Sequence, residues 1–163
     1  MSTTPRPNFS AGSDPAAAEA ALAPLLTANG GRWTLNPSGE ALEREFKFKT
    51  FAKTWDFMTA VSLQCKLKNH HPEWSNVFNT TFIRWTTHHP KGLSTLDLEL
   101  ATTCDRLAHD FGEVVPPSDS QPQQQAPEAK GTGKGEACGL AGLADRVVGG
   151  AGDCCVPKGK KAT

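Results

Sequence analysis

The sequence predicts an α+β fold of two layers, with helices packed on one face of an antiparallel sheet of three to four strands. Three stretches predict it. Between residues 42 and 51, apolar and charged residues alternate, which is the period of a half-buried strand. Between residues 52 and 68, and again between residues 93 and 111, apolar residues recur every three or four positions, as they do on amphipathic helices.

The first expected element is a helix. Asp14 followed by Pro15 is typical of an N-cap and a first helical turn, and an Ala-rich run continues to about residue 28. Pro24 interrupts this run and is expected to split the helix, because proline cannot donate the backbone hydrogen bond of a helix interior.

Two strands are expected next, joined as a hairpin. Residues 33–35 read as a short strand, and the sequence Asn-Pro-Ser-Gly at residues 36–39 is typical of a turn. In the strand over residues 42–51, alternation directs Leu42, Phe46 and Phe48 to one face and Glu45, Lys47 and Lys49 to the other.

A helix follows over about residues 52–68, and Pro72 stops it because proline disfavours helical geometry in the preceding residue. Residues 74–87 are rich in β-branched and aromatic residues and are expected to form one or two strands. A last helix follows, with Ser94 as its N-cap. The apolar stripes of the two helices are expected to be Trp55, Met58, Val61 and Cys65, and Leu93, Leu96, Leu100, Cys104, Leu107 and Phe111.

Composition divides the chain into three parts. Residues 1–13 read as a flexible leader, residues 14–111 as the folded domain, and residues 112–163, which are dense in Pro, Gln, Gly and Lys, as a mostly disordered tail. Lys plus Arg and Asp plus Glu are equal at 17 each, so no net field draws the protein directly to nucleic acid or to a membrane surface. We expect a soluble cytoplasmic protein, with a nuclear or organellar pool left open.

The five cysteines are an odd number without a C-x-x-C pair, so neither a disulfide framework nor a zinc ribbon is indicated. Cys65 and Cys104 fall on the apolar stripes and read as small buried hydrophobes.

Four of the five histidines form two adjacent pairs, each followed by proline: His70–His71 and His88–His89. Both pairs lie where a strand meets a helix, and such junctions can converge on one rim of a sheet. An imidazole gives or takes a proton near neutral pH, so convergent imidazoles suit general acid and base steps. Asp97 could accept from one of these rings and fix its tautomer.

Other interpretations of these residues stay open at this point. His-Pro and His-His occur in surface loops without a function, and Ser94 with Asp97 resembles a capping box. Histidine is also a common ligand of zinc and copper, although the pairs lack helical ligand spacing. Trp74 and Trp85 could stack on a flat ligand or could simply belong to the core.

The block "NHHPEW" at residues 69–74, followed by "TTH" at residues 86–88, "GL" at residues 92–93 and Asp97, resembles the pterin-4a-carbinolamine dehydratases. The resemblance extends over about residues 22–108. It implies a small antiparallel sheet with helices on one face, assembled as a homodimer or homotetramer. It also implies dehydration of 4a-hydroxytetrahydropterin to quinonoid dihydropterin, a hydro-lyase reaction of tetrahydrobiopterin recycling that needs no cofactor and no metal.

The resemblance also implies roles for individual residues. It makes His70, His71 and His88 the acid/base and substrate-contacting groups, with Asp97 supporting His88. The residues that would border the pterin are Pro72, Glu73, Trp74, Thr87, His89 and Pro90. Three positions depart from the common pattern: Lys66 stands where an acidic residue is usual, Phe78 where tyrosine is frequent, and His89–Pro90 where smaller or acidic residues follow the histidine.

The resemblance leaves one alternative function, which is non-enzymatic. Relatives of this fold can serve as dimerisation cofactors of a transcription factor, as coactivators or as assembly scaffolds. Because a scaffold has no evident need for three histidines, their presence favours the enzyme.

Overall fold

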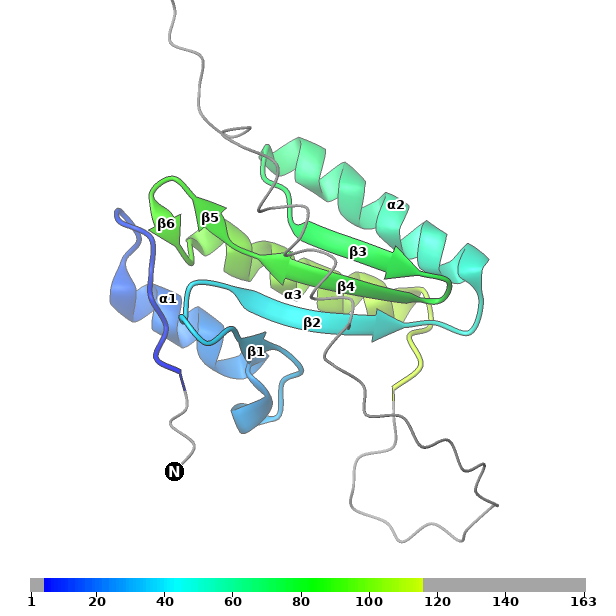
Figure 1. Ribbon diagram of the computed structural model, residues 1–163, viewed down its shortest axis with the longest axis horizontal. Helices are drawn as coiled ribbons and strands as arrows, with labels where there is room; N and C mark the ends of the chain where they lie inside the picture. Colours follow the sequence, from blue (N-terminus) through cyan, green and yellow to red (C-terminus); the bar gives the residue numbers. More distant parts are fainter. Residues whose placement is uncertain (1–4, 116–163) are drawn as a thin grey trace, which may run out of the picture.

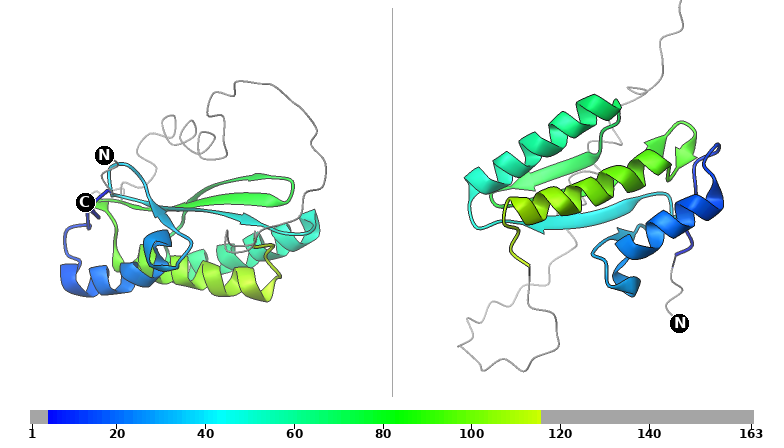
Figure 2. Two further views of the ribbon diagram at one scale, coloured as in Figure 1. Left: turned by 90° about the horizontal axis from the view of Figure 1, so that it is seen from below. Right: turned by 180° about the vertical axis from the view of Figure 1, so that it is seen from behind.

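The computed structural model describes residues 5–115, and its helices all lie on one face of an antiparallel sheet (Figures 1 and 2). The predicted two-layer α+β class is therefore confirmed. The helices are α1 (Pro15–Leu22), α2 (Phe51–Lys68) and α3 (Thr95–Asp110), with 3-10 turns at Ala23–Leu25 and Thr27–Asn29. The strands are β1 (Thr34–Leu35), β2 (Leu42–Lys47), β3 (Glu73–Val77), β4 (Thr80–Trp85), β5 (Thr87–His88) and β6 (Lys91–Gly92).

The main sheet has the strand order β1-β2-β4-β3, and every neighbouring pair in it is antiparallel. β1 and β2 form the predicted hairpin, and β3 and β4 form a second one. β5 and β6 pair separately, as a short ribbon that leads from β4 into α3. This ribbon carries His88 and puts it at the same end of the sheet as the start of β3.

Alternation in β2 is confirmed by burial, because Leu42, Phe46 and Phe48 are fully buried while Glu45 and Lys47 are exposed. The strand ends at Lys47, earlier than expected. Thr50 then caps α2, where its side-chain oxygen accepts from the backbone N–H of Lys53 at 3.3 Å. The largest fully buried side chains include Trp33, Phe46, Phe57, Ile83, Trp85 and Leu98.

The apolar stripe expected for α2 is wrong at Trp55, which is 55% exposed. The helix packs instead through Thr54, Phe57 and Val61, of which Phe57 is 0% exposed. Aromatic and aliphatic residues lie on both sides of this helix, so spacing alone did not distinguish the packed side from the exposed one. Pro24 does divide the first helical region: α1 ends at Leu22, and 3-10 turns follow.

The expected boundaries of the folded part need two corrections. Phe9, expected in a flexible leader, pairs with Leu93, and Ser10 is buried. Beyond α3, Glu113 accepts from Arg44 Nη2 at 2.6 Å, so residues 112–115 continue the folded part. The rest of the expected tail, residues 116–163, lies outside the described residues. Within residues 5–115, no helix is long and apolar enough to cross a membrane.

Candidate active site

A cavity of about 240 Å³ opens at the end of the sheet where α2 stops and the β5–β6 ribbon begins. Its lining brings both histidine pairs together, although they are far apart in the sequence. The residues that line it are Asn69, His70, His71, Thr86, Thr87, His88 and His89.

The end of α2 aims the first histidine pair at this cavity. Asn69 adopts a left-handed conformation, with a φ of 50°, which asparagine tolerates better than most residues. The backbone N–H of His70 then donates to the carbonyl oxygen of Cys65 at 3.1 Å. Pro72 is buried and directs the chain into β3. The chain therefore turns sharply at His70 and His71.

His70 is held by a buried carboxylate. Its Nε2 lies 2.6 Å from Oδ1 of Asp97, a residue that is 0% exposed. The His70 ring also lies nearly parallel to the ring of Trp85, with the centroids 5.8 Å apart. The expected pairing of Asp97 with His88 is therefore wrong: in this chain Asp97 supports His70.

Asp97 keeps its capping role at the same time. Its Oδ2 accepts from the backbone N–H of Ser94 at 2.8 Å and from the Ser94 hydroxyl at 2.9 Å, at the start of α3. The hydroxyl of Thr87 lies 2.8 Å from the same oxygen. One buried carboxylate thus joins three elements: the end of α2, the ribbon and the start of α3.

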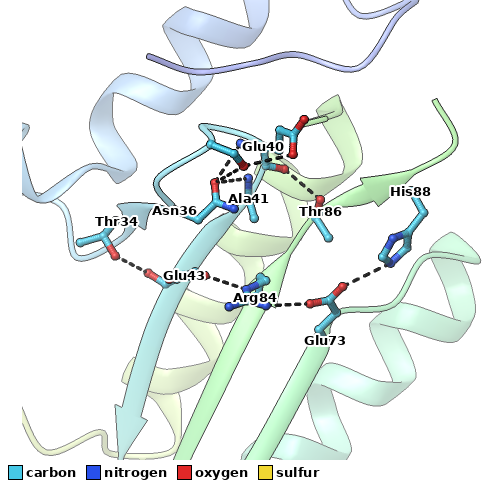
Figure 3. A network of polar contacts seen from close by, with 10 residues as sticks. Thr34, Asn36, Glu40, Ala41, Glu43, Glu73, Arg84, Thr86 and His88 are labelled. Atoms are coloured by element: carbon cyan, nitrogen blue, oxygen red, sulfur yellow. Dashed lines mark hydrogen bonds and ion pairs between the residues drawn. The ribbon is translucent and has the colours of Figure 1, made fainter. Parts of the chain in front are cut away.

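His88 has a different acidic neighbour, which is Glu73. Its Nε2 lies 3.4 Å from Glu73 Oε1, and Glu73 Oε2 accepts from Arg84 Nη1 at 3.2 Å. Arg84 Nε in turn donates to Glu43 at 2.7 Å (Figure 3). The three charged side chains come from β2, β4 and β3 at matched register, since Arg84 is opposite both Glu43 and Glu73.

The residues expected to border the pterin divide into two groups. Thr87 and His89 line the cavity. Pro72, Glu73, Trp74 and Pro90 are not among its lining residues: Trp74 packs against the core, Pro90 is exposed, and Glu73 contacts His88 and Arg84. Trp85 is fully buried, which agrees with the core interpretation of that residue.

Asn69 and Thr86 line the cavity but were not expected there. Both are direct sequence neighbours of the expected site residues, inside the "NHHPEW" and "TTH" blocks, and that position was the available signal. Among residues 5–115, no group of three or more His, Cys, Asp or Glu side chains is arranged to hold a metal ion.

The chain is similar to proteins of known families. A family model described as pterin 4 alpha carbinolamine dehydratase matches residues 14–107. A relative from Dinoroseobacter shibae, named "Putative pterin-4-alpha-carbinolamine dehydratase", is 41% identical over 87 residues, which are 53% of this chain and 87% of the relative. A relative of the same name from Prochlorococcus marinus is 45% identical over 75 residues, which are 46% of this chain and 76% of the relative.

A solved structure is also similar. The "transcriptional coactivator/pterin dehydratase" from Brucella melitensis superimposes with a TM-score of 0.51 and 30% sequence identity. The match covers 58% of this chain and 96% of that one.

Proposed function

Given that the chain belongs to the pterin 4 alpha carbinolamine dehydratase family, we propose that it removes water from 4a-hydroxytetrahydropterin to give quinonoid dihydropterin. This is the dehydration step of tetrahydrobiopterin recycling. The observation that carries the proposal is the cavity in which His70 and His88, each with its own carboxylate neighbour, face a common space.

The reaction needs two proton transfers. The leaving 4a-hydroxyl oxygen gains a proton and departs as water, while a ring nitrogen of the pterin loses a proton and the new double bond forms. Two imidazoles can perform these transfers without a covalent intermediate. The atoms balance without an oxidant, a reductant or another reactant.

His70 is suited to accept a proton. When its Nε2–H donates to Asp97, the other ring nitrogen, Nδ1, carries a lone pair that can take a proton from the substrate. The buried Asp97 carboxylate then stabilises the imidazolium that forms, which is the logic of a histidine oriented by an aspartate.

His88 is suited to donate. The Glu73 carboxylate lies 3.4 Å from its Nε2 and can orient the ring toward the cavity. From there an imidazole can deliver a proton to the leaving hydroxyl. His71 and His89 complete the rim, together with Thr87, as groups that can contact the pterin. The cavity is somewhat smaller than the roughly 300–1,000 Å³ typical for drug-sized ligands, which suits a small bicyclic heterocycle.

Stopped-flow measurement of 4a-hydroxytetrahydropterin dehydration by the purified chain tests this proposal. We expect acceleration over buffer that persists after exhaustive chelation. A rate equal to that of buffer would remove the proposed activity. Loss of activity on chelation and its return with zinc would overturn the metal-free chemistry.

We also propose that the chain forms a homodimer or homotetramer. Phe51 and Trp55 stack on each other with ring centroids 5.7 Å apart and are both exposed on α2, as are Leu63 and Leu67. Apolar groups of this size favour an interface when they are gathered on one element. Sedimentation should show an assembly that Trp55→Glu dissociates and that Ala20→Glu, on the exposed side of α1, leaves intact. A monomeric wild-type chain would contradict it.

A further inference from the structure

The segment before α1 runs alongside the turn that carries the second histidine pair (Figures 1 and 2). The backbone N–H of Leu93 donates to Asn8 at 2.9 Å, and the N–H of Ser10 donates back to Leu93 at 2.8 Å, which gives a parallel bridge at Phe9. On its other side, the N–H of Asn8 donates to Gly39 at 2.8 Å. Residues 6–10, here termed the strap, are therefore bonded both to the β1–β2 turn and to Leu93, which lies between β6 and α3.

Two glycines allow this close approach. A Cβ atom on Gly39 would lie 1.8 Å from the carbonyl oxygen of Arg6, and one on Gly92 would lie 2.7 Å from the backbone nitrogen of Ser10. These distances are shorter than any real Cβ contact, so a side chain at either position would displace the strap or its neighbour. Phe9 anchors the strap by packing against the core.

Ser10 links the strap to the histidine turn directly. Its hydroxyl donates to the carbonyl oxygen of Pro90 at 2.7 Å, and the residue is only 5% exposed. Pro90 follows His89 and lies in the connection between β5 and β6, which pair His88 with Lys91. The bond therefore restrains the turn at Pro90, which is not among the residues that line the cavity.

A second contact reaches the same turn through Glu40. Asn8 Nδ2 donates to Glu40 Oε1 at 3.3 Å, and Lys91 Nζ lies 2.8 Å from Glu40 Oε2. The Lys91 ammonium, with help from Ser38, holds the pKa of the Glu40 carboxyl below its usual range. The carbonyl oxygen of Glu40 also accepts from the hydroxyl of Thr86, which lines the cavity.

We propose that the strap positions His88 and His89 for the pterin, so that residues outside the matched family region of 14–107 take part in building the site. This inference rests on the proposed function for its substrate, but its geometric part stands independently. A turn that is restrained at Pro90 and Lys91 holds its histidines in one orientation. Loss of these restraints lowers the fraction of molecules whose site is ready to bind the pterin. The strap residues are not among the residues that line the cavity, and their role is therefore one of positioning.

Ser10→Ala tests the strap with the smallest change, in the full chain. NMR of the histidine ring signals should show shifts for His88 and His89 but none for His109, which is 90% exposed on α3. The dissociation constant for 7,8-dihydrobiopterin, a pterin without the 4a-hydroxyl, should rise about threefold to tenfold, the range expected for loss of one neutral hydrogen bond.

Ser62→Ala is the matched control for that variant. The Ser62 hydroxyl also donates to a backbone carbonyl at 2.7 Å, but within α2 and away from the strap. It should leave the His88 and His89 signals and the dissociation constant unchanged. Unchanged ring signals in Ser10→Ala, or equal shifts in Ser62→Ala, would overturn the inference.

Gly39→Ala and Gly30→Ala form a second matched pair. Both glycines have a positive φ, 74° and 86°, so alanine strains the backbone similarly at each, but a Cβ on Gly30 meets nothing within 4 Å. Only Gly39→Ala should shift the His88 and His89 signals. Equal effects of the two would contradict a role for the strap.

The ring signals separate this inference from the proposed function. If Ser10→Ala shifts the ring signals but the chain binds no pterin, the positioning role of the strap stands and the proposed substrate is wrong. If the chain binds pterin normally and Ser10→Ala shifts no ring signal, the proposed substrate stands and the positioning role of the strap is wrong.

Discussion

Glu73 Oε1 lies 3.4 Å from His88 Nε2, and the other oxygen of the same carboxylate accepts from Arg84. Glu73 therefore connects His88, which lines the cavity, with Arg84 on the neighbouring strand. Its position directly after Pro72 is what brings it within reach of both. As the first residue of β3, it starts opposite Arg84 and reaches His88 at the neighbouring ribbon.

Replacing Glu73 by Gln should lower kcat/KM about threefold to tenfold, because a neutral amide keeps the shape of the side chain but removes the carboxylate charge beside His88 and Arg84. Glu45→Gln is the control, since Glu45 is an exposed carboxylate of the same sheet that contributes no bond to this network. Steady-state kinetics of both variants give the two values of kcat/KM. Equal rates for Glu73→Gln and wild type would show that His88 works without its carboxylate neighbour.

Asp97 should contribute to both stability and catalysis. Asp97→Asn loses the charge that orients His70 and half of the capping box, so we expect a loss of about 1–3 kcal/mol in the free energy of unfolding and a kcat lower by about 10- to 100-fold. Ser94→Ala removes a capping hydroxyl but leaves the contact between Asp97 and His70. It should cost about 1 kcal/mol of stability with kcat close to wild type. Urea unfolding and turnover, measured on both variants, separate the two roles. If kcat fell equally in Asp97→Asn and Ser94→Ala, the role of Asp97 would be capping alone.

The two cysteines of the helices should be unreactive in the folded protein. Burial raises the pKa of the Cys65 thiol to about 11 and that of Cys104 further. Because the thiolate is the reactive form, only about one thousandth of Cys65 is reactive at pH 8. Alkylation with iodoacetamide followed by peptide mass spectrometry should show slow labelling at pH 8, faster labelling as the pH rises toward 11, and rapid labelling in denaturant. Rapid labelling of native Cys104 would contradict its burial.

The packed side of α2 can be identified by the effect of substitutions on the free energy of unfolding. Phe57→Ala should reduce the free energy of unfolding by about 3–5 kcal/mol, because it empties a fully buried site between α2 and the sheet. Trp55→Ala should change it by no more than about 0.5 kcal/mol when measured at dilutions that keep protomers apart. Chemical denaturation gives both values, and the reverse order of effects would mean that α2 packs through the other side.

Much of the fold was accessible from local patterns. Alternation in β2, Ser94 as the cap of α3 and the split at Pro24 each depend on residues close together in the sequence, and the structure agrees with all three. The exposure of Trp55 and the burial of Phe57 could not be predicted, because they depend on which side of α2 the sheet and α3 occupy.

The candidate site shows the same limit. Two His-His-Pro motifs at element junctions predicted that distant imidazoles meet, and they do line one cavity. The sequence did not show which carboxylate contacts which histidine ring, because Asp97 and Glu73 both lie near histidines along the chain. The fold decides it, since it brings Asp97 to His70 and Glu73 to His88. The pairing of residues 8–10 with Leu93 was also missed, because a Pro- and Ser-rich segment without periodicity reads as unstructured.

The most direct test of the account is the single-turnover rate of 4a-hydroxytetrahydropterin dehydration by wild type, His70→Ala, His88→Ala and the control His109→Ala. His109 is exposed and does not line the cavity. We expect a rate lower by about 100-fold or more in each of the first two variants, the scale of a lost general acid or base, and a wild-type rate in the control. Wild-type turnover in both His70→Ala and His88→Ala would contradict it.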